Sequence, residues 1–333
     1  MKIRIGTFNL YQFVEPPFSW YTKREKFTPQ EWEEKTAWIK QQIIDMNCDI
    51  IGFQEVFSKK ALKTLVSELG FKYFKTIDSA KRDKKNENVY ISTTVALASK
   101  YPIKNLKRVE IDFSALKKHY FEGFFKFARE PIKATVILPN DKELNVYVCH
   151  LKSNRDNEFE YIFTKDTTLK EKIEKVTKAL KENYSLSLKQ RLCEASSLYS
   201  DIKQSNKPSV LITDLNDKEF SLTIEALTNR KYHENKLSKD DFLLLDAYHH
   251  AKKEVYNPHP EFKGIKRVPT SYFAGKGNIL DYVFVSNHFD KKKKNNIGKV
   301  CSYEVFNKHL EKNQNGSLLQ SDHAQVVCEI EYL

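Results

Sequence analysis

The sequence predicts an α/β (α+β) fold in a single domain that spans residues 1–333. Short runs rich in Val, Ile, Phe and Tyr alternate along the whole chain with segments whose apolar residues recur at helical spacing. No Pro-, Gly- or Ser-rich linker divides the sequence, and no internal repeat is evident. Hydrophobic residues make up 40% of the chain, and aromatic residues make up 13% of the chain. This composition is typical of globular proteins and excludes an intrinsically disordered chain.

Strands are predicted where β-branched and aromatic residues cluster between turn-forming residues. In sequence order these segments are Lys2–Asn9, Ile50–Gln54, Thr93–Ser99, Ala134–Leu138, Asn145–His150, Ser209–Thr213, Leu280–Ser286 and Gln325–Tyr332.

Helices are predicted where an apolar stripe recurs every three or four residues, and we interpret these stripes as core rather than as cofactor sites. The helical segments are Pro29–Met46, Ser58–Leu69, Thr167–Asn183, Leu188–Gln204 and Phe220–Thr228. The stripe of the first helix consists of Trp32, Thr36, Ile39, Ile43 and Met46. Thr28, Pro29 and Glu31 predict a capping box at its start. The stripe of the fourth helix consists of Leu188, Leu192, Ala195, Leu198, Tyr199 and Ile202.

Three segments, 110–127, 155–186 and 229–267, are interpreted as insertions into the domain, and Lys291–Asn296 as a polar surface loop. The start of the chain, Met1–Leu10, has no apolar segment of the kind found in signal peptides, and no run approaches the roughly 20 apolar residues of a membrane helix. We therefore expect a cytoplasmic monomer without a transmembrane segment, with export that needs no signal peptide left open.

The five cysteines are widely spaced and contain no CxxC pair, so we expect reduced, mostly buried thiols and no structural zinc. The net charge of +12 suits a polyanionic substrate such as nucleic acid or a phosphorylated lipid. A lysine-rich composition alone explains the same charge, so both interpretations remain open.

Polar residues stand at the ends of the predicted strands, where loops of an α/β fold converge to form sites. They are Asn9, Glu55, His150, Asp214, Asn216, Asp281, Asp322 and His323. Any one of them alone is more often a turn residue, a helix cap or a satisfied core histidine. As an ordered set they predict a catalytic site.

This set also has a consistent chemistry. The carboxylates of Glu55, Asp214 and Asp322 are hard oxygen ligands suited to Mg²⁺ or Mn²⁺, whereas zinc prefers Cys and His. Asp281 could orient His323 as a base, and a second histidine, His150, could serve phosphoryl oxygens or a leaving group. The amides of Asn9 and Asn216 could contact a phosphate.

The segments TFNL, GFQEV, CHLKSN, TDLND, ILDYVFVS and SDH, in this order, resemble the motifs of the endonuclease/exonuclease/phosphatase superfamily. The resemblance runs from about Ile3 to Ile330. FAREP, at residues 127–131, is similar to a deoxyribonuclease segment whose arginine contacts phosphate, which makes Arg129 a candidate phosphate ligand. A surface salt bridge is the alternative interpretation of Arg129.

The resemblance implies a four-layer sandwich of two packed mixed β-sheets flanked by helices. It implies Asn9 and Glu55 near the metal, Asp214 and Asn216 around the nucleophile and phosphate, an Asp281–His323 pair that activates water, and Asp322 as a further metal ligand or orienting group. Two departures stand out: Thr213 replaces the usual glycine before the Asp-x-Asn motif, and no carboxylate near Ser92 is placed to pair with His150.

The sequence thus predicts a Mg²⁺- or Mn²⁺-dependent phosphoric ester hydrolase, first of all a phosphodiesterase or nuclease. A phosphomonoesterase or a lipid phosphodiesterase, acting on phosphoinositides or sphingomyelin, is the alternative. A binding protein that kept the fold without turnover is the remote one. Aromatic residues of 117–129 could form a nucleic-acid-binding lip, or could simply pack an inserted segment. These residues are His119, Tyr120, Phe121, Phe124 and Phe125.

Overall fold

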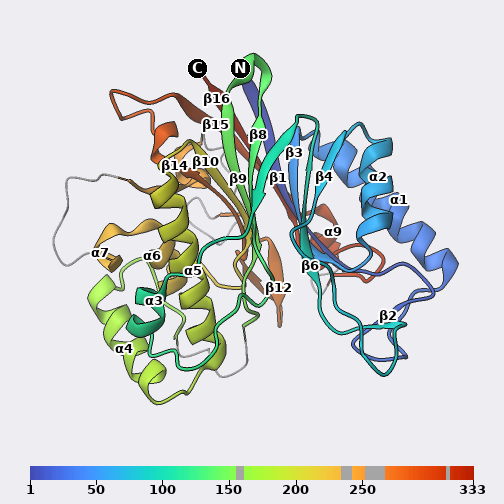
Figure 1. The fold of residues 1–333 in the computed structure, drawn as a ribbon, viewed down its shortest axis with the longest axis horizontal. Helices are drawn as coiled ribbons and strands as arrows, with labels where there is room; N and C mark the ends of the chain where they lie inside the picture. The colour runs from blue at the N-terminus through green and yellow to red at the C-terminus, as the bar shows by residue number, and fades with distance from the viewer. Residues whose placement is uncertain (155–160, 234–241, 252–266, 313–315) are drawn as a thin grey trace.

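In the computed structural model, two six-stranded mixed sheets pack face to face and helices cover both outer faces, so the predicted α/β sandwich is confirmed (Figure 1). The structure describes residues 1–154, 161–233, 242–251, 267–312 and 316–333. Parts of the predicted insertions 155–186 and 229–267 lie outside these described residues.

The first sheet has the strand order β15-β16-β1-β3-β6-β4, in which β1 and β3 run parallel and the other neighbours antiparallel. Its strands are β1 (Lys2–Phe13), β3 (Ile50–Val56), β4 (Tyr73–Lys75), β6 (Thr94–Ser99), β15 (Gly298–Phe306) and β16 (Gln325–Tyr332).

The second sheet has the order β11-β14-β10-β9-β8-β7, in which β9 and β10 form the parallel pair. Its strands are β7 (Ile103–Lys107), β8 (Ile132–Ile137), β9 (Glu143–His150), β10 (Ser209–Asp214), β11 (Leu244–Asp246) and β14 (Asp281–Ser286). Two short ribbons, β2–β5 (Ser19–Trp20 and Val89–Tyr90) and β12–β13 (Ser271–Phe273 and Lys276–Asn278), complete the strands.

Alternation along the strands divides the core into three layers. In β9, Val146 and Val148 pack between the sheets, whereas Tyr147 and Cys149 face the helices beyond the second sheet. The two sheets approach closely at Gly52, where an added Cβ would lie 2.7 Å from a side-chain carbon of Ile212. Glycine at this position therefore lets the central strands of the two sheets come together.

Helices α1 (Pro29–Met46) and α2 (Lys59–Glu68) lie on the outer side of the first sheet, and the remaining larger helices lie beyond the second (Figure 1). The capping box at Thr28 is confirmed, because its side chain accepts from the Glu31 amide while Glu31 accepts from the Thr28 amide. The other helices are α3 (Phe113–Lys118), α4 (Leu169–Lys181), α5 (Leu186–Ser205), α6 (Leu222–Thr228), α7 (Arg230–His233), α8 (Ala247–His250) and α9 (Lys308–Lys312).

The stripe of α1 differs from the prediction in the first half of the helix. The buried members are Lys35, Ile39, Ile43 and Met46, whereas Trp32 and Thr36 are only partly buried. The stripe of α5 is buried as predicted.

Strand β15 is missing from the sequence prediction because its sequence, GKVCSYEVF, is interrupted by charged and small polar residues. It forms the outer edge of the first sheet, and edge strands carry such residues because they block pairing with other chains. The same reasoning applies to β7, an edge strand of the second sheet with two exposed lysines, Lys104 and Lys107.

The segment 110–127 folds against α5. The amides of Glu110 and Asp112 donate to Asp201 and Ser197 of that helix. Of the residues considered for a binding lip, His119 and Phe125 are buried, so they pack the segment instead, whereas Phe124 is 87% exposed.

All five cysteines are free and four are buried, as predicted; Cys301 is partly exposed. Within the described residues, no helix combines the length and apolar character required to cross a membrane.

Candidate active site

The carboxyl ends of the two parallel strand pairs bring the predicted polar residues together. Asp214 stands beside His150 in the β10–β9 pairing and beside Asp281 in the β10–β14 pairing. In the first sheet, Asn9 pairs with Gln54, the residue before Glu55. The Asn9 amide then bridges the sheets, because its Nδ2 donates to Asp214 Oδ2 at 3.0 Å.

Both parallel strands of the first sheet are irregular at this end. The pairing of β1 with β3 shifts register between Asn9 and Phe13, and Tyr11 (φ 48°), Gln12 (φ 62°) and Glu55 (φ 58°) have left-handed backbones. This bulge directs the backbone N–H of Gln12 toward Glu55, and it donates to Oε2 at 3.0 Å. Bulges and strained backbones of this kind concentrate at functional sites, where they re-aim side chains.

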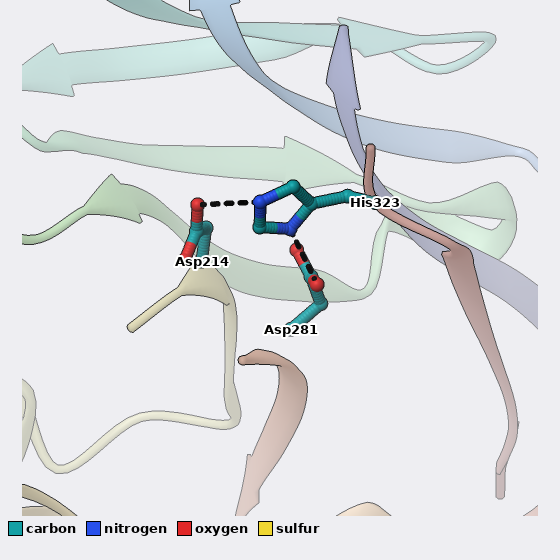
Figure 2. Close-up of side chains that lie close together, drawn as sticks. All are labelled: Asp214, Asp281 and His323. Carbon is teal, nitrogen blue, oxygen red and sulfur yellow. Dashed lines mark hydrogen bonds and ion pairs between the residues drawn. The ribbon is translucent and has the colours of Figure 1, made fainter. Parts of the chain in front are cut away.

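The imidazole of His323 lies between two carboxylates (Figure 2). Its Nδ1 is 2.8 Å from Asp281 Oδ2, and its Nε2 is 3.9 Å from Asp214 Oδ2. The short Asp281 contact fixes the ring so that Nε2 is the nitrogen that faces the centre of the site. Asp281 itself is fully buried, and its amide donates to Thr270 Oγ1 at 3.2 Å.

Asp214 contacts most members of the cluster. Its Oδ2 accepts from the side-chain amide of Asn9 and lies 3.3 Å from His150 Nε2. Its Oδ1 accepts from the backbone N–H of Asn216 at 2.8 Å. Asn216 has a left-handed backbone (φ 51°), and its side chain donates to the Leu151 carbonyl, which places its amide group beside the end of β9.

The opposite charges of the carboxylates and the imidazolium stabilise each other and shift the pKa values of these groups. Burial alone would lower the pKa of His323, but the negative charges of Asp281 and Asp214 outweigh it and hold that pKa well above its ordinary value. Burial raises the pKa of Asp214 to about 6, and the charge of His323 works against that rise. A buried His–Asp pair with a perturbed pKa inside a polar cluster is typical of catalytic sites.

His150 differs from His323 because it lacks a carboxylate at its second nitrogen. Within the described chain its Nδ1 has no hydrogen-bond partner, in keeping with the missing upstream carboxylate. Burial, together with the charges of Arg129 and His323, lowers the pKa of His150 well below its ordinary value. His150 is therefore neutral here and suited to donate or accept a hydrogen bond rather than to carry charge.

Arg129 lies beside the same cluster. Its Nη1 donates to the Leu151 carbonyl at 2.8 Å and its Nη2 to Ser153 Oγ at 3.3 Å. Both partners follow His150 in the chain. Burial raises the pKa of Glu55, and the charge of Arg129 is one of the influences that work against this rise. These contacts hold the guanidinium at the edge of the site, which fits a phosphate contact better than a remote surface salt bridge.

Glu55 and Asp322 form an acidic centre next to the His323 cluster. Burial and the charge of Asp322 raise the pKa of Glu55, and burial raises the pKa of Asp322. Two partly buried carboxylates that repel each other are stabilised by a divalent cation, and hard oxygen ligands suit Mg²⁺ or Mn²⁺. The donor set therefore fits such an ion.

A second metal-like grouping needs a different interpretation. Asp214, Asp281 and His323 also offer ligand atoms within 4.8 Å of one another. However, His323 Nδ1 and Asp281 Oδ2 are in direct hydrogen-bond contact at 2.8 Å, which leaves no space for an ion between them. We interpret this trio as an acid–base group.

Several supporting residues were not singled out from the sequence. Ser321 Oγ donates to the Asn9 carbonyl at 2.8 Å and accepts from the His323 amide, so it joins β1 to the segment that carries the histidine. Lys35 is fully buried and donates to the carbonyls of Leu318 and Gln320 just ahead of that segment. A lysine at an apolar-stripe position of α1 was the one available signal.

Comparison with known proteins identifies a family and several solved structures of similar fold. The sequence model described as "Endonuclease/Exonuclease/phosphatase family" matches residues 6–297. No curated protein sequence matches this chain.

Among solved structures, the catalytic domain of human nocturnin with bound sulfate has a TM-score of 0.57 at 16% identity, covering 100% of this chain and 95% of its own. A Bacteroides vulgatus endonuclease/exonuclease/phosphatase has a TM-score of 0.55 at 16% identity, with 100% of both chains covered. A mannosyl-6-phosphatase from Bacteroides thetaiotaomicron has a TM-score of 0.54 at 14% identity, covering 99% of this chain and 100% of its own. The chain therefore belongs to the endonuclease/exonuclease/phosphatase family.

Proposed function

We propose that this protein is a Mg²⁺- or Mn²⁺-dependent phosphodiesterase that cleaves nucleic acid by attack of water on phosphorus. The observation that carries the proposal is the buried Asp281–His323 pair, whose free nitrogen faces Asp214 next to the acidic pair of Glu55 and Asp322. This arrangement combines a base, a hydrogen-bonded carboxylate and a cation site within one small volume.

In this mechanism, the deprotonated form of His323 accepts the proton of the attacking water at Nε2. Asp281 stabilises the imidazolium that forms, and the raised pKa of His323 makes that proton transfer more favourable. Asp214 orients the water through Oδ2, and Asn9 keeps that carboxylate in place. The neutral His150 and the side-chain amide of Asn216 donate hydrogen bonds to the non-bridging oxygens as negative charge builds on them. Arg129 holds a phosphate oxygen at the edge of the site.

Glu55 and Asp322 would hold the divalent cation, with the amide oxygen of Asn9 as a third candidate ligand. Bound there, the cation would neutralise charge on the phosphoryl and leaving oxygens. The Gln12 amide donates to Glu55 Oε2, so Oε1 is the oxygen of that carboxylate best placed to serve as a ligand.

The net charge of +12 supports a polyanionic substrate, and Arg129 lies beside the proposed catalytic residues. The fold is shared with a mannosyl-6-phosphatase, so a phosphomonoester or lipid substrate remains the alternative outcome of a direct test.

That test measures hydrolysis of plasmid DNA, single-stranded DNA, RNA, phosphoinositides, sphingomyelin and a sugar phosphate, each with Mg²⁺, with Mn²⁺ and with EDTA. We expect metal-dependent cleavage of nucleic acid that EDTA abolishes. Metal-dependent cleavage of the lipids or the sugar phosphate alone would move the function to that class.

Glu55→Gln tests the cation site separately from turnover. We expect this variant to bind Mn²⁺ at least about 10-fold more weakly by electron paramagnetic resonance, because it replaces a charged oxygen ligand with a neutral one. Glu68→Gln is the matched control, since Glu68 is an exposed residue that pairs with Lys40 on the outer helices. Equal Mn²⁺ affinity in the two variants would remove Glu55 from the site.

A further inference from the structure

Tyr21 lies in a loop whose backbone is held by several hydrogen bonds. It follows β2, and its amide donates to the Tyr90 carbonyl of the neighbouring strand β5 at 2.7 Å. On either side of it, the Trp20 amide donates to the Glu25 carbonyl and the Thr22 amide to the Trp20 carbonyl. These bonds fix the backbone at the position where the ring leaves it.

The backbone of Tyr21 is strained. Its φ is 56°, a left-handed conformation that a bulky aromatic residue rarely adopts and that glycine or asparagine would accept more easily. Strain of this kind persists where the surroundings determine the conformation, and it concentrates at functional positions. The strained backbone here directs an aromatic ring outward, because the side chain of Tyr21 is 51% exposed.

The ring is nevertheless backed by a firm aromatic support. Its edge meets Phe57 with 5.9 Å between ring centroids and planes at 77°, and Phe57 in turn packs against Tyr90 at 5.7 Å. Phe57 is buried and lies only two residues beyond Glu55 along the chain. A half-exposed ring held on an immobile base offers a flat surface to a ligand at low entropic cost.

The contact with Phe57 brings the Tyr21 ring close to Glu55, because Phe57 follows Glu55 by two residues in the chain. Besides burial, the charge of Glu55 raises the pKa of Tyr21, while the charge of Arg129 acts in the opposite direction. Tyr21 thus lies within electrostatic reach of both the proposed cation ligand and the proposed phosphate ligand. An exposed aromatic surface at this place would contact the group attached to the phosphate.

We propose that Tyr21 is a substrate-binding residue that stacks on an unpaired nucleobase adjoining the scissile phosphate. This inference rests on the proposed function and narrows it to single-stranded or locally unpaired nucleic acid. Base stacking on an aromatic ring is tolerant of sequence, because every base has a flat face. Tyr21 would therefore select for the presence of a base rather than for its identity.

Two oligonucleotides of equal length and charge test the proposal, one carrying bases throughout and one with abasic residues around the cleavage position. The measured quantity is the ratio of kcat/KM for the first substrate to that for the second. Tyr21→Asn removes the ring and suits the left-handed backbone, so it separates loss of stacking from loss of folding. We expect the ratio to fall about 10-fold, which corresponds to about 1.4 kcal/mol.

Two further variants sharpen the result. Tyr21→Phe keeps the ring and should keep the ratio within about twofold of wild type. Phe113→Ala removes another strongly exposed aromatic residue, at the start of α3 in the helical flank, and should leave the ratio as it is. Thermal unfolding of each variant verifies that it is folded.

The outcomes separate the two proposals. An unchanged ratio in Tyr21→Asn, with wild-type cleavage of the base-containing strand, overturns the role of Tyr21 alone. A ratio that falls equally in Tyr21→Phe also overturns it, because the ring would then not be what matters. A wild-type protein that cleaves neither oligonucleotide but hydrolyses another phosphate ester overturns the proposed function.

Discussion

Buried or partly buried histidines occur in two regions of the molecule, and their partners differ. At the edge of the sheets that carries the candidate active site, His323 contacts Asp281 and lies near Asp214. In the helical flank formed by α3, α5 and α7, His119 contacts the Tyr232 hydroxyl at 2.6 Å, and His233 stacks on the Tyr199 ring with centroids 4.3 Å apart.

The difference in partners reverses the electrostatic outcome. The carboxylates hold the pKa of His323 above its ordinary value in spite of burial. Burial and the charge of Lys118 lower the pKa of His119 to about 3, and burial lowers that of His233 to about 4. Burial of a histidine alone therefore does not indicate a catalytic role, whereas a buried carboxylate bonded to one ring nitrogen does.

The largest effect should come from replacing the histidine of the candidate active site. We expect His323→Ala to lower kcat by about 10²- to 10⁴-fold, because the proposed general base is lost. Asp281→Asn should also lower kcat, because an amide can no longer stabilise the imidazolium. Steady-state hydrolysis of the substrate found in the panel measures both.

His119→Gln in the helical flank is the matched control, because it alters an equally buried histidine. Its kcat, corrected for the folded fraction, should stay within about threefold of wild type. If His323→Ala keeps a wild-type kcat, or if His119→Gln loses as much as His323→Ala, the assignment of the base is wrong.

Two buried lysines, one in each region, allow the same comparison, with a smaller expected effect. Lys35 donates to the carbonyls of Leu318 and Gln320 near Asp322, whereas Lys172 pairs with Glu225 in the flank at 2.6 Å. Lys35→Met would leave two carbonyls without their donor and loosen the segment before Asp322. We expect about 10-fold weaker Mn²⁺ binding by electron paramagnetic resonance, the usual effect of losing a group that orients a ligand.

Lys172→Met should bind Mn²⁺ as the wild type does, since it lies among α4 and α6. Lys35→Arg, which keeps donors at the same place, should recover part of the affinity. An Mn²⁺ affinity that Lys35→Met leaves intact would show that the segment holds Asp322 without the lysine.

The comparison also explains what the sequence could predict. The fold was predictable because most central strands read as apolar segments and the family motifs stand at their ends. The edge strands β7 and β15 were not predictable, because the charged residues that protect edge strands from aggregation make their sequences resemble those of loops. Burial of Lys35 instead of Thr36 was likewise not predictable, since it depends on which carbonyls a distant loop presents to α1.

The meeting of the site residues was predictable from strand order, but the details of their contacts were not. Register places His150, Asp214 and Asp281 side by side, as strand ends of one sheet require. The bulge that turns the Gln12 amide to Glu55 has no clear sequence marker, because Tyr11 and Gln12 are not residues that favour a left-handed backbone. The exposed ring of Tyr21 was hidden for the same reason.

The smallest effect concerns stability and belongs to the flank. Histidines with a depressed folded-state pKa bind fewer protons in the folded than in the unfolded protein, so their stabilising effect is present above the unfolded pKa of about 6.5 and lost as pH falls below it. For His119, with a folded pKa of about 3, the free energy of unfolding should fall by about 2 kcal/mol between pH 7.5 and pH 5.

Urea unfolding of wild type and His119→Gln at both pH values isolates this contribution. Glutamine does not titrate, so the variant should lose about 2 kcal/mol less than wild type over the same range. His323 works in the opposite direction, because its raised pKa makes protonation favour the folded state as pH falls. An equal loss in both proteins would mean that His119 is protonated in the fold, which burial of its ring and the charge of Lys118 oppose.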